Sequence, residues 1–342
     1  MEAPILERIR TSLIERQNGL SQWLRFTPTP ARDVMLGPLT EQAVEAHLGT
    51  IEHSIERAEA GTLGCCQICH ETVETDLLEV DYTARFCLEH LSVEEARQLQ
   101  AELELAQTVQ RTLLPQQVPD TPGLEIAAFT RPAQIVGGDY FDFVEFQGGT
   151  PGLAVADVAG HGVSASLHMA SIQALLRSTV QMGHSPAEVV MRMQRLFVHN
   201  IRYTTFVTFF LGAFDPATRT LTYCNAGHNP PLVLRDRGRD GLSRVWLNPT
   251  GAAIGLVEEP NLAEGTLPLA DGDLLAIYTD GVTEAVGRHR EQFGQERLAT
   301  LLEQMHRSSP KEVIQAIKEA LEAHTEGRPL SDDTTVVVCK IR

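Results

Sequence analysis

Short apolar runs separated by turn residues make up most of the sequence from Leu124 to the C-terminus. The runs are LEIAAFT, YFDFVEF, GLAVADV, TFVTFFLGAF, RTLTYCNA, PLVLRD, DLLAIYT and TTVVVCKI. Runs of this length with Gly, Pro or Asn between them are typical of β-strands that pair mostly antiparallel. Helices are predicted over residues 164–182, 186–200 and 310–324. We therefore predict an α+β fold in which helices cover the outer faces of a β-sandwich.

The length and charge of the chain limit its architecture and its ligands. A chain of 342 residues exceeds the usual size of one domain, so a large domain and a smaller one are expected. The net charge is −17, with 45 acidic and 28 basic residues, and no basic stripe suits a phosphate backbone. No apolar stretch approaches the roughly 20 residues that span a bilayer, and the first residues, MEAPILERIR, lack the apolar core of a signal peptide. We expect a cytoplasmic protein that binds neither nucleic acid directly nor a membrane.

Four of the six cysteines lie within residues 65–87, which indicates a metal site rather than a disulfide framework. Cys66 and Cys69 have two residues between them, as do Cys87 and His90, and 17 residues separate the two pairs. This is the spacing of a tetrahedral zinc site with three thiolates and one imidazole. We predict one structural zinc ion at these four residues, with Cys65 as a surplus thiol that could replace Cys66.

The stretch around these ligands resembles the DksA/TraR-type zinc finger. The shared features are a preceding helix, the turn Gly61-Thr62-Leu63-Gly64 and the two ligand pairs. Leu63 stands where that family has an aromatic residue, His70 where it has Gly, and His90 where it has Cys. The preceding helix has an apolar seam at Val44, Leu48, Ile51, Ile55 and Ala58, and a helix over Ile5, Ile9 and Leu13 is expected to pair with it as a helical hairpin.

A further helix is predicted between the finger and the large domain. The segment LSVEEARQLQAELELAQTVQRTLLP opens with Ser92 and Glu95 at capping-box spacing and ends at Pro115. Its seam places Gln110 among apolar residues, and such a polar residue often fixes register or oligomeric state; the seam is Ala96, Leu99, Leu103, Ala106 and Leu113. The helix either pairs with a second copy, giving the homodimer that we expect, or packs on its own domain. The predicted organisation is hairpin and finger over 1–91, linker or dimerisation helix over 92–114, and the large domain over 115–342.

Four aspartates occupy comparable places, each where an apolar run meets a glycine or another turn residue. They are Asp139 in VGGDYFD, Asp157 in AVADVAGHG, Asp280 in AIYTDGVTEA and Asp332 in LSDDTTVVV. Carboxylates gathered at such strand ends repel one another unless cations neutralise them. Hard oxygen ligands in a group select magnesium or manganese. The pattern therefore predicts a divalent-metal site.

From about Leu113 to Arg342 the chain resembles the PPM-type metal-dependent serine/threonine protein phosphatases of the SpoIIE/RsbU-like branch. The resemblance rests on LLP, RPAQIVGGDYFD, VADVAGHGVSAS, TTFVTFFLGAFD, YCNAGHNPPLVL, TGAAIGL, YTDGVTEA and SDDTTVVV, in that order. It implies an α-β-β-α sandwich that binds two Mn²⁺ or Mg²⁺ ions.

The resemblance also implies a role for each aspartate. Asp157 would bridge the two ions and the Val158 carbonyl would bind one of them. Asp280 and Asp332 would hold the other ion, and Asp139 would act directly or through a water. Asp333 would support the turn rather than bind metal.

Three further residues are considered for this chemistry. His161 lies four positions after Asp157, farther than the corresponding histidine of eukaryotic-type relatives, and the general acid stays open. His228 in NAGHNPP is interpreted as a structural hydrogen-bonding residue. Arg131 is the nearest match to the basic residue that grips phosphate in those relatives.

Two cations a few ångströms apart can activate water for in-line attack on phosphorus, so no covalent nucleophile is required. A serine hydrolase is not indicated, because GxSxG is absent. The resemblance implies a phosphorylated regulatory substrate, such as an anti-sigma-factor antagonist of the STAS type, with control through the zinc-finger module. The alternatives are a transcription-related protein that docks through the zinc-finger stalk and a two-metal phosphodiesterase acting on nucleotides.

Overall fold

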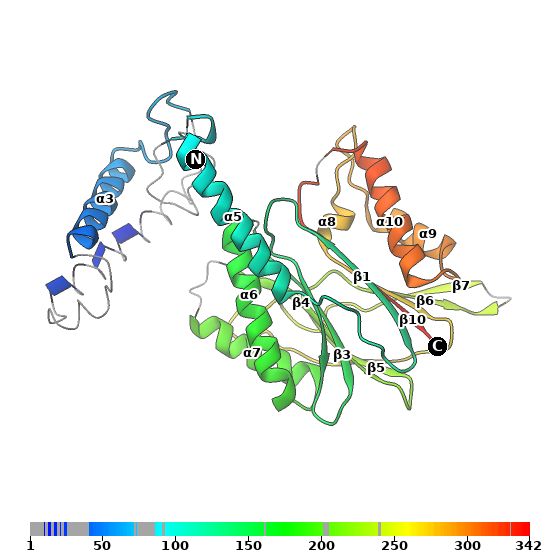
Figure 1. The fold of residues 1–342 in the computed structure, drawn as a ribbon. Coiled ribbons are helices and arrows are strands. Elements are labelled where there is room, and N and C mark those ends of the chain that lie inside the picture. The colour runs from blue at the N-terminus through cyan, green and yellow to red at the C-terminus, as the bar shows by residue number, and fades with distance from the viewer. Residues whose placement is uncertain are drawn as a thin grey trace. The chain divides into compact units, whose positions relative to one another are not determined.

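Figure 1 shows the fold of the chain, a computed structural model of the 342 residues. The structure describes residues 10, 13–14, 17–18, 21, 24–25, 41–71, 73, 86–90, 93–160, 162–200, 205–238, 241–328 and 330–342. The chain divides into two compact units, Met1–Glu102 and Leu103–Arg342. The boundary falls inside helix α5 (Val93–Leu113), within the helix predicted over 92–114. A separate linker segment over 92–114 stays a prediction.

Two five-stranded antiparallel sheets form the frame of the large unit. The first has the order β1-β10-β9-β6-β7 and the second β2-β3-β4-β5-β8. The strands of the first sheet are β1 (Leu124–Arg131), β10 (Thr334–Ile341), β9 (Leu274–Tyr278), β6 (Leu232–Asp236) and β7 (Leu242–Trp246). Those of the second are β2 (Tyr140–Glu145), β3 (Pro151–Val158), β4 (Val207–Asp215), β5 (Thr220–Ala226) and β8 (Gly265–Pro268).

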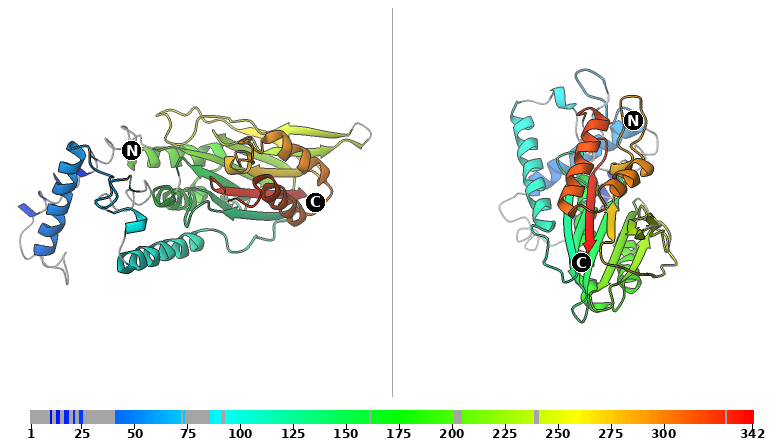
Figure 2. Two further views of the ribbon diagram at one scale, coloured as in Figure 1. Left: turned by 90° about the horizontal axis from the view of Figure 1, so that it is seen from above. Right: turned by 90° about the vertical axis from the view of Figure 1, so that its right-hand side faces the viewer.

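The sheets pack face to face, and helices cover both outer faces (Figures 1 and 2). Helices α6 (Gly162–Thr179) and α7 (Pro186–Asn200) cover the second sheet, while α9 (Gln295–Gln304) and α10 (Pro310–Thr325) cover the first. The period of a strand explains this arrangement: on β3, Leu153 and Val155 face the other sheet, whereas Ala154, Ala156 and Val158 face the helices. The predicted α-β-β-α sandwich is confirmed for this unit.

Elements at the margins of the fold were not predicted. Strands β7 and β8 each lie at one edge of their sheet, and their residues are half-buried or exposed. These two strands bury little apolar surface, so LSRVW and GTLP have a weak hydrophobic pattern. Helix α8 (Asp280–Thr283) is a single turn. The helix predicted over 164–182 ends as α6 at Thr179, and a 3₁₀ turn, η2 (Val180–Met182), completes it.

The small unit contains α3 (Glu41–Glu59) and a core that includes two cysteines. Leu13, which is helical, lies in the same apolar cluster as Ile51 of α3; the other members are Ala58, Leu63, Cys66, Val73 and Cys87. Ile5, Ile9 and Ser92 lie outside the described residues, so the complete hairpin and the capping box stay predictions. None of the helices in the described part of the chain is long and apolar enough to cross a membrane.

A buried ion pair fastens α6 to the second sheet. The Asp142 carboxylate is fully buried on β2, where it accepts hydrogen bonds from the Tyr140 hydroxyl and the Phe143 amide. Arg177 of α6 donates to both of its oxygens, with Nε 2.7 Å from Oδ2. A buried carboxylate without its cation would keep an uncompensated charge, so this pair constrains where α6 can lie.

We expect Arg177→Met to destabilise the protein. Breaking a buried pair costs about 3–5 kcal/mol, but the guanidinium is 52% exposed, so we expect about 2 kcal/mol. That loss lowers Tm by roughly 6 °C in a domain of this size, measured by thermal unfolding. The control is Arg192→Met, because Arg192 pairs with Glu188 on the surface of α7. Equal Tm changes in the two variants would contradict the role given to Arg177.

Candidate active site

Strand register brings the four predicted aspartates to one end of the sandwich. Strand β10 begins beside the end of β9, with Val336 opposite Tyr278, so Asp332 and Asp280 lie at the same strand end of the first sheet. Strand β2 begins beside the end of β3, with Tyr140 opposite Ala156, so Asp139 and Asp157 lie together at one strand end of the second sheet. A hydrogen bond connects these two ends of the sheets: the Thr279 hydroxyl donates to Asp139 Oδ2 at 2.7 Å.

The carboxylates interact strongly with one another. Burial raises the pKa of Asp157 to about 8, and the negative charges of Asp280 and Asp332 add to the effect. Burial, with the charges of Asp332 and Glu284, raises the pKa of Asp280 to about 6. The pKa of Asp139 is raised well above its usual value by burial and then by Asp157. A cluster in this state is stabilised by protons or by cations.

The chemistry of the donor set fits divalent metal ions. Asp139 Oδ1 is buried and has no hydrogen-bond partner among the described residues, so it is available as a ligand. The Val158 carbonyl oxygen faces Gly138, where a Cβ atom would lie 3.0 Å from it. Carboxylate and carbonyl oxygens are ligands that Mg²⁺ and Mn²⁺ accept. The four aspartates do not form a cluster as tight as the cysteine group described below, so their joint ligation is a proposal.

The structure adds residues that sequence reasoning missed. Thr279 is fixed as a donor to Asp139, because the Thr335 amide donates to its Oγ1 at 2.9 Å. Glu284, at the end of α8, contributes negative charge to Asp157 and Asp280. Both residues flank Asp280 in YTDGVTEA, so their position beside a predicted ligand was the available signal.

The remaining predicted residues have different surroundings. His161 lies outside the described residues. His228 is buried, its Nδ1 lies 2.8 Å from Thr208 Oγ1, and burial lowers its pKa to about 3. Thr208 is paired with Asp157 across the β3–β4 ladder, so His228 supports the strand end that carries the central carboxylate. Arg131 is exposed at the end of β1, opposite Thr334.

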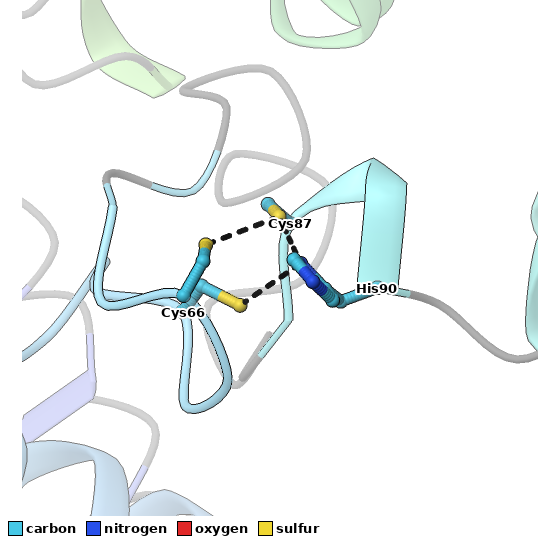
Figure 3. A group of neighbouring side chains, drawn as sticks. Cys66, Cys87 and His90 are labelled. Atoms are coloured by element: carbon cyan, nitrogen blue, oxygen red, sulfur yellow. Dashed lines mark hydrogen bonds between the residues drawn. The ribbon is translucent and has the colours of Figure 1, made fainter.

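The predicted zinc ligands converge in the small unit (Figure 3). The ligand atoms of Cys66, Cys69, Cys87 and His90 all lie within 4.8 Å of one another. Cys69 Sγ and Cys87 Sγ are 3.8 Å apart, which matches the edge of about 3.8 Å in a tetrahedron with Zn–S bonds of about 2.3 Å. Cys65 is not part of this group. The arrangement fits one zinc ion.

Three residues in the turns beside this cluster have left-handed backbone conformations. Gly61 and Gly64 both have positive φ, and His70, at the position where the finger has Gly, has φ 61°. The Arg57 side chain donates to the carbonyl oxygens of Thr62 and Cys65, which ties the end of α3 to the first ligand pair.

Comparisons with known proteins agree with the fold. The sequence model of Stage II sporulation protein E (SpoIIE) matches residues 147–342. Phosphoserine phosphatase RsbU of Bacillus subtilis (strain 168) is 29% identical over 246 residues, which are 71% of this chain and 71% of RsbU. The SiaA-PP2C domain of Pseudomonas aeruginosa superimposes with a TM-score of 0.64 at 23% identity, over 72% of this chain and 98% of that domain. The RsbU and RsbW domains of Rv1364c from Mycobacterium tuberculosis give a TM-score of 0.57 at 28% identity, over 67% and 63% of the two chains.

The sandwich, its carboxylate-lined end and these relatives together define a PPM-type protein serine/threonine phosphatase. Within that class, the chain belongs to the SpoIIE family.

The repulsion among the carboxylates should make the metal-free protein sensitive to pH. The folded-state pKa values of Asp157 and Asp280, about 8 and about 6, lie above the usual 3.8. A raised pKa gives stability that is present at low pH and lost as pH rises through the folded-state value. We therefore expect the Tm of protein treated with a chelator to fall between pH 5 and pH 8, and Mn²⁺ to reverse the fall.

Asp157→Asn tests this explanation, because the amide cannot ionise. At pH 8 it should raise the Tm of the metal-free protein by roughly 5 °C. Asp271→Asn is the control, since Asp271 is 64% exposed and pairs with Arg219 on the surface. A Tm that is flat with pH, or that falls in Asp157→Asn, would show that the carboxylates do not repel one another in the fold.

Proposed function

We propose that this phosphatase removes phosphate from serine or threonine of a regulatory protein, with two Mn²⁺ or Mg²⁺ ions held at the aspartate end of the sandwich. The ligands are Asp139, Asp157, Asp280, Asp332 and the Val158 carbonyl. The observation that carries the proposal is the set of mutually repelling carboxylates, in which Asp139 is buried with an Oδ1 that has no hydrogen-bond partner among the described residues and the others are half-buried. A site of this kind is costly to keep without a cation-dependent role.

The two ions, when bound, supply positive charge that stabilises the transferring phosphoryl group. The protein orients its ligands for this purpose. Asp157 has the central place, because it is coupled to Asp139 on one side and to Asp280 and Asp332 on the other. The Thr279 hydroxyl holds Asp139 Oδ2 and leaves Oδ1 available. Arg131 is the proposed contact for the substrate phosphate, which its exposure at the end of β1, opposite Thr334, supports.

The relatives support the proposed substrate class. RsbU is named a phosphoserine phosphatase, and this chain matches it over 71% of both lengths. In Rv1364c a domain of the RsbU kind occurs beside an RsbW domain. By this likeness, the substrate is a phosphorylated anti-sigma-factor antagonist of the STAS type, in the cytoplasm.

The oligomeric state forms part of the same proposal. Gln110, the polar residue of the predicted seam, bonds to the backbone of its own domain, so this part of the seam packs internally. Another face of α5 exposes Leu105 and Val109, 65% and 52% exposed, at i and i+4. A homodimer would therefore use that face rather than the predicted seam.

The zinc-finger module is proposed to control the phosphatase. Its support is the converged Cys66, Cys69, Cys87 and His90 group and the single helix, α5, that begins after this group and ends in the large unit. The alternative is a transcription-related protein that docks through this module, and it gives the aspartate cluster no role.

The enzymatic proposal is tested by phosphate release from a phosphoserine STAS protein with Mn²⁺, compared with a cyclic dinucleotide. We expect turnover of the phosphoprotein alone. Asp157→Asn should lower turnover by more than about a hundredfold, beyond the 10–100-fold typical of a residue that only supports a ligand. Asp271→Asn should match the unsubstituted enzyme. Turnover of Asp157→Asn within tenfold of the unsubstituted enzyme would remove Asp157 from the mechanism, and turnover of the dinucleotide alone would favour the phosphodiesterase.

The zinc proposal is tested by elemental analysis of the purified protein. We expect about one zinc per chain, lost in a Cys66→Ser, Cys69→Ser double variant because the remaining two ligands cannot hold the ion. Cys65→Ser is the matched control and should keep the zinc. Phosphatase turnover measured on the same proteins tests control by the module. Full zinc in the double variant would refute the ligand assignment, and equal turnover with and without zinc would refute the control.

A further inference from the structure

Two glutamines of α5 reach the backbone of the loop that precedes Asp139. Gln107 Nε2 donates to the Ile135 carbonyl at 2.9 Å. Gln110, one turn later, bonds to both backbone groups of Gly137: its Nε2 donates to the carbonyl at 2.6 Å, and its Oε1 accepts from the amide at 3.2 Å. The Gln110 amide thus pairs with Gly137 as a neighbouring strand would.

The same loop is held from its other side by Asp333. This carboxylate, 3% exposed, accepts from the Ala133 amide at 2.7 Å and from the Gly138 amide at 2.6 Å. A Cβ atom on Gly137 would lie within 2.6 Å of the Asp333 carboxylate, so only glycine fits there. The backbone at 133–138 is therefore clamped between Gln110 and Asp333, and the next residue is Asp139.

We propose that Gln110 is a positioning residue for the metal centre. It fixes the Gly137 peptide and thereby the position of Asp139. Without this contact, the Asp139 carboxylate, whose Oδ1 has no partner among the described residues, would have to be oriented when the ion binds. The inference rests on the proposed two-ion function, and Gln107 assists by holding Ile135.

Only an amide side chain suits this position. Gln110 uses a donor and an acceptor at once, and both Gly137 groups lose their partner if the side chain is apolar. A glutamate would keep an acceptor for the Gly137 amide but would set a carboxylate oxygen against the Gly137 carbonyl. An apolar residue at position 110 therefore removes both hydrogen bonds to Gly137, whereas a glutamate removes only the one to the Gly137 carbonyl.

The test uses the full-length protein and two measurements on Gln110→Leu. Titration calorimetry with Mn²⁺ should give an affinity about tenfold or more below that of the unsubstituted protein, the range expected for loss of a residue that orients a ligand. Hydrogen exchange of the metal-free protein should speed up in peptides that cover residues 133–139. Turnover at saturating Mn²⁺ should recover, since the ligands themselves are intact. Gln110→Glu should keep slow exchange at the Gly137 amide while Mn²⁺ affinity still falls.

The matched control is Gln116→Leu. Gln116 lies just beyond α5, and its side chain bonds only to the nearby carbonyls of Arg111 and Leu114 among the described residues, so affinity and exchange should not change. Mn²⁺ affinity within twofold of the unsubstituted protein, together with unchanged exchange over 133–139 in Gln110→Leu, would overturn the proposal. Failure of the unsubstituted protein to bind Mn²⁺ would instead overturn the two-ion function, while the exchange measurement would still decide whether Gln110 holds the loop.

Discussion

Repulsion among carboxylates at one end of the sandwich is the constraint that the rest of the large unit must satisfy. Asp139, Asp157 and Asp280 all have raised pKa values, first because they are buried and then because they face one another. The fold must supply the energy that holds them together. It does so through three apolar layers, one between the sheets and one under each pair of helices. A rigid frame is thus required before the charged end can exist.

The same constraint explains the hydrogen bonds around the site. A carboxylate in a repelling cluster turns away from its neighbours unless its orientation is fixed. Thr279 fixes Asp139 directly, and Asp333 and Gln110 fix the loop that carries it. Asp333 is itself a carboxylate, but its two oxygens accept from the Ala133 and Gly138 amides of that loop, whereas Asp332 Oδ1 accepts from the neighbouring Asp333 amide. The site therefore contains two kinds of carboxylate oxygen. Those of Asp333 accept hydrogen bonds from the backbone, whereas Asp139 Oδ1 has no partner among the described residues.

The chain carries two sets of candidate metal ligands in separate units. The large unit offers carboxylates, and the SpoIIE match lies wholly within it. The small unit offers three thiolates and an imidazole outside the family match, so the relatives carry no statement about its role. Soft and hard ligands select different ions, so the two proposed sites would not compete for one metal. Helix α5 is the described element that belongs to both units.

The sequence alone determined the features that are local. Eight strands, the helices α6, α7 and α10, the aspartates at strand ends and the cysteine pairs follow from periodicity, turn residues and ligand spacing, which neighbouring residues carry. Strands β7 and β8 were not predicted, because their residues are half-buried or exposed and their hydrophobic pattern is weak.

Tertiary structure decided which residues support the site, because those contacts join distant segments. Asp333 meets Ala133 across 200 positions, and Thr279 meets Asp139 across 140. Gln110 illustrates the difference. Its place in an apolar helical seam predicted a role between helices, whereas in the fold its side chain forms hydrogen bonds with the Gly137 backbone. A periodic pattern identifies the face that is buried but not the surface that covers it, and only the packing of sheets and helices supplies that surface.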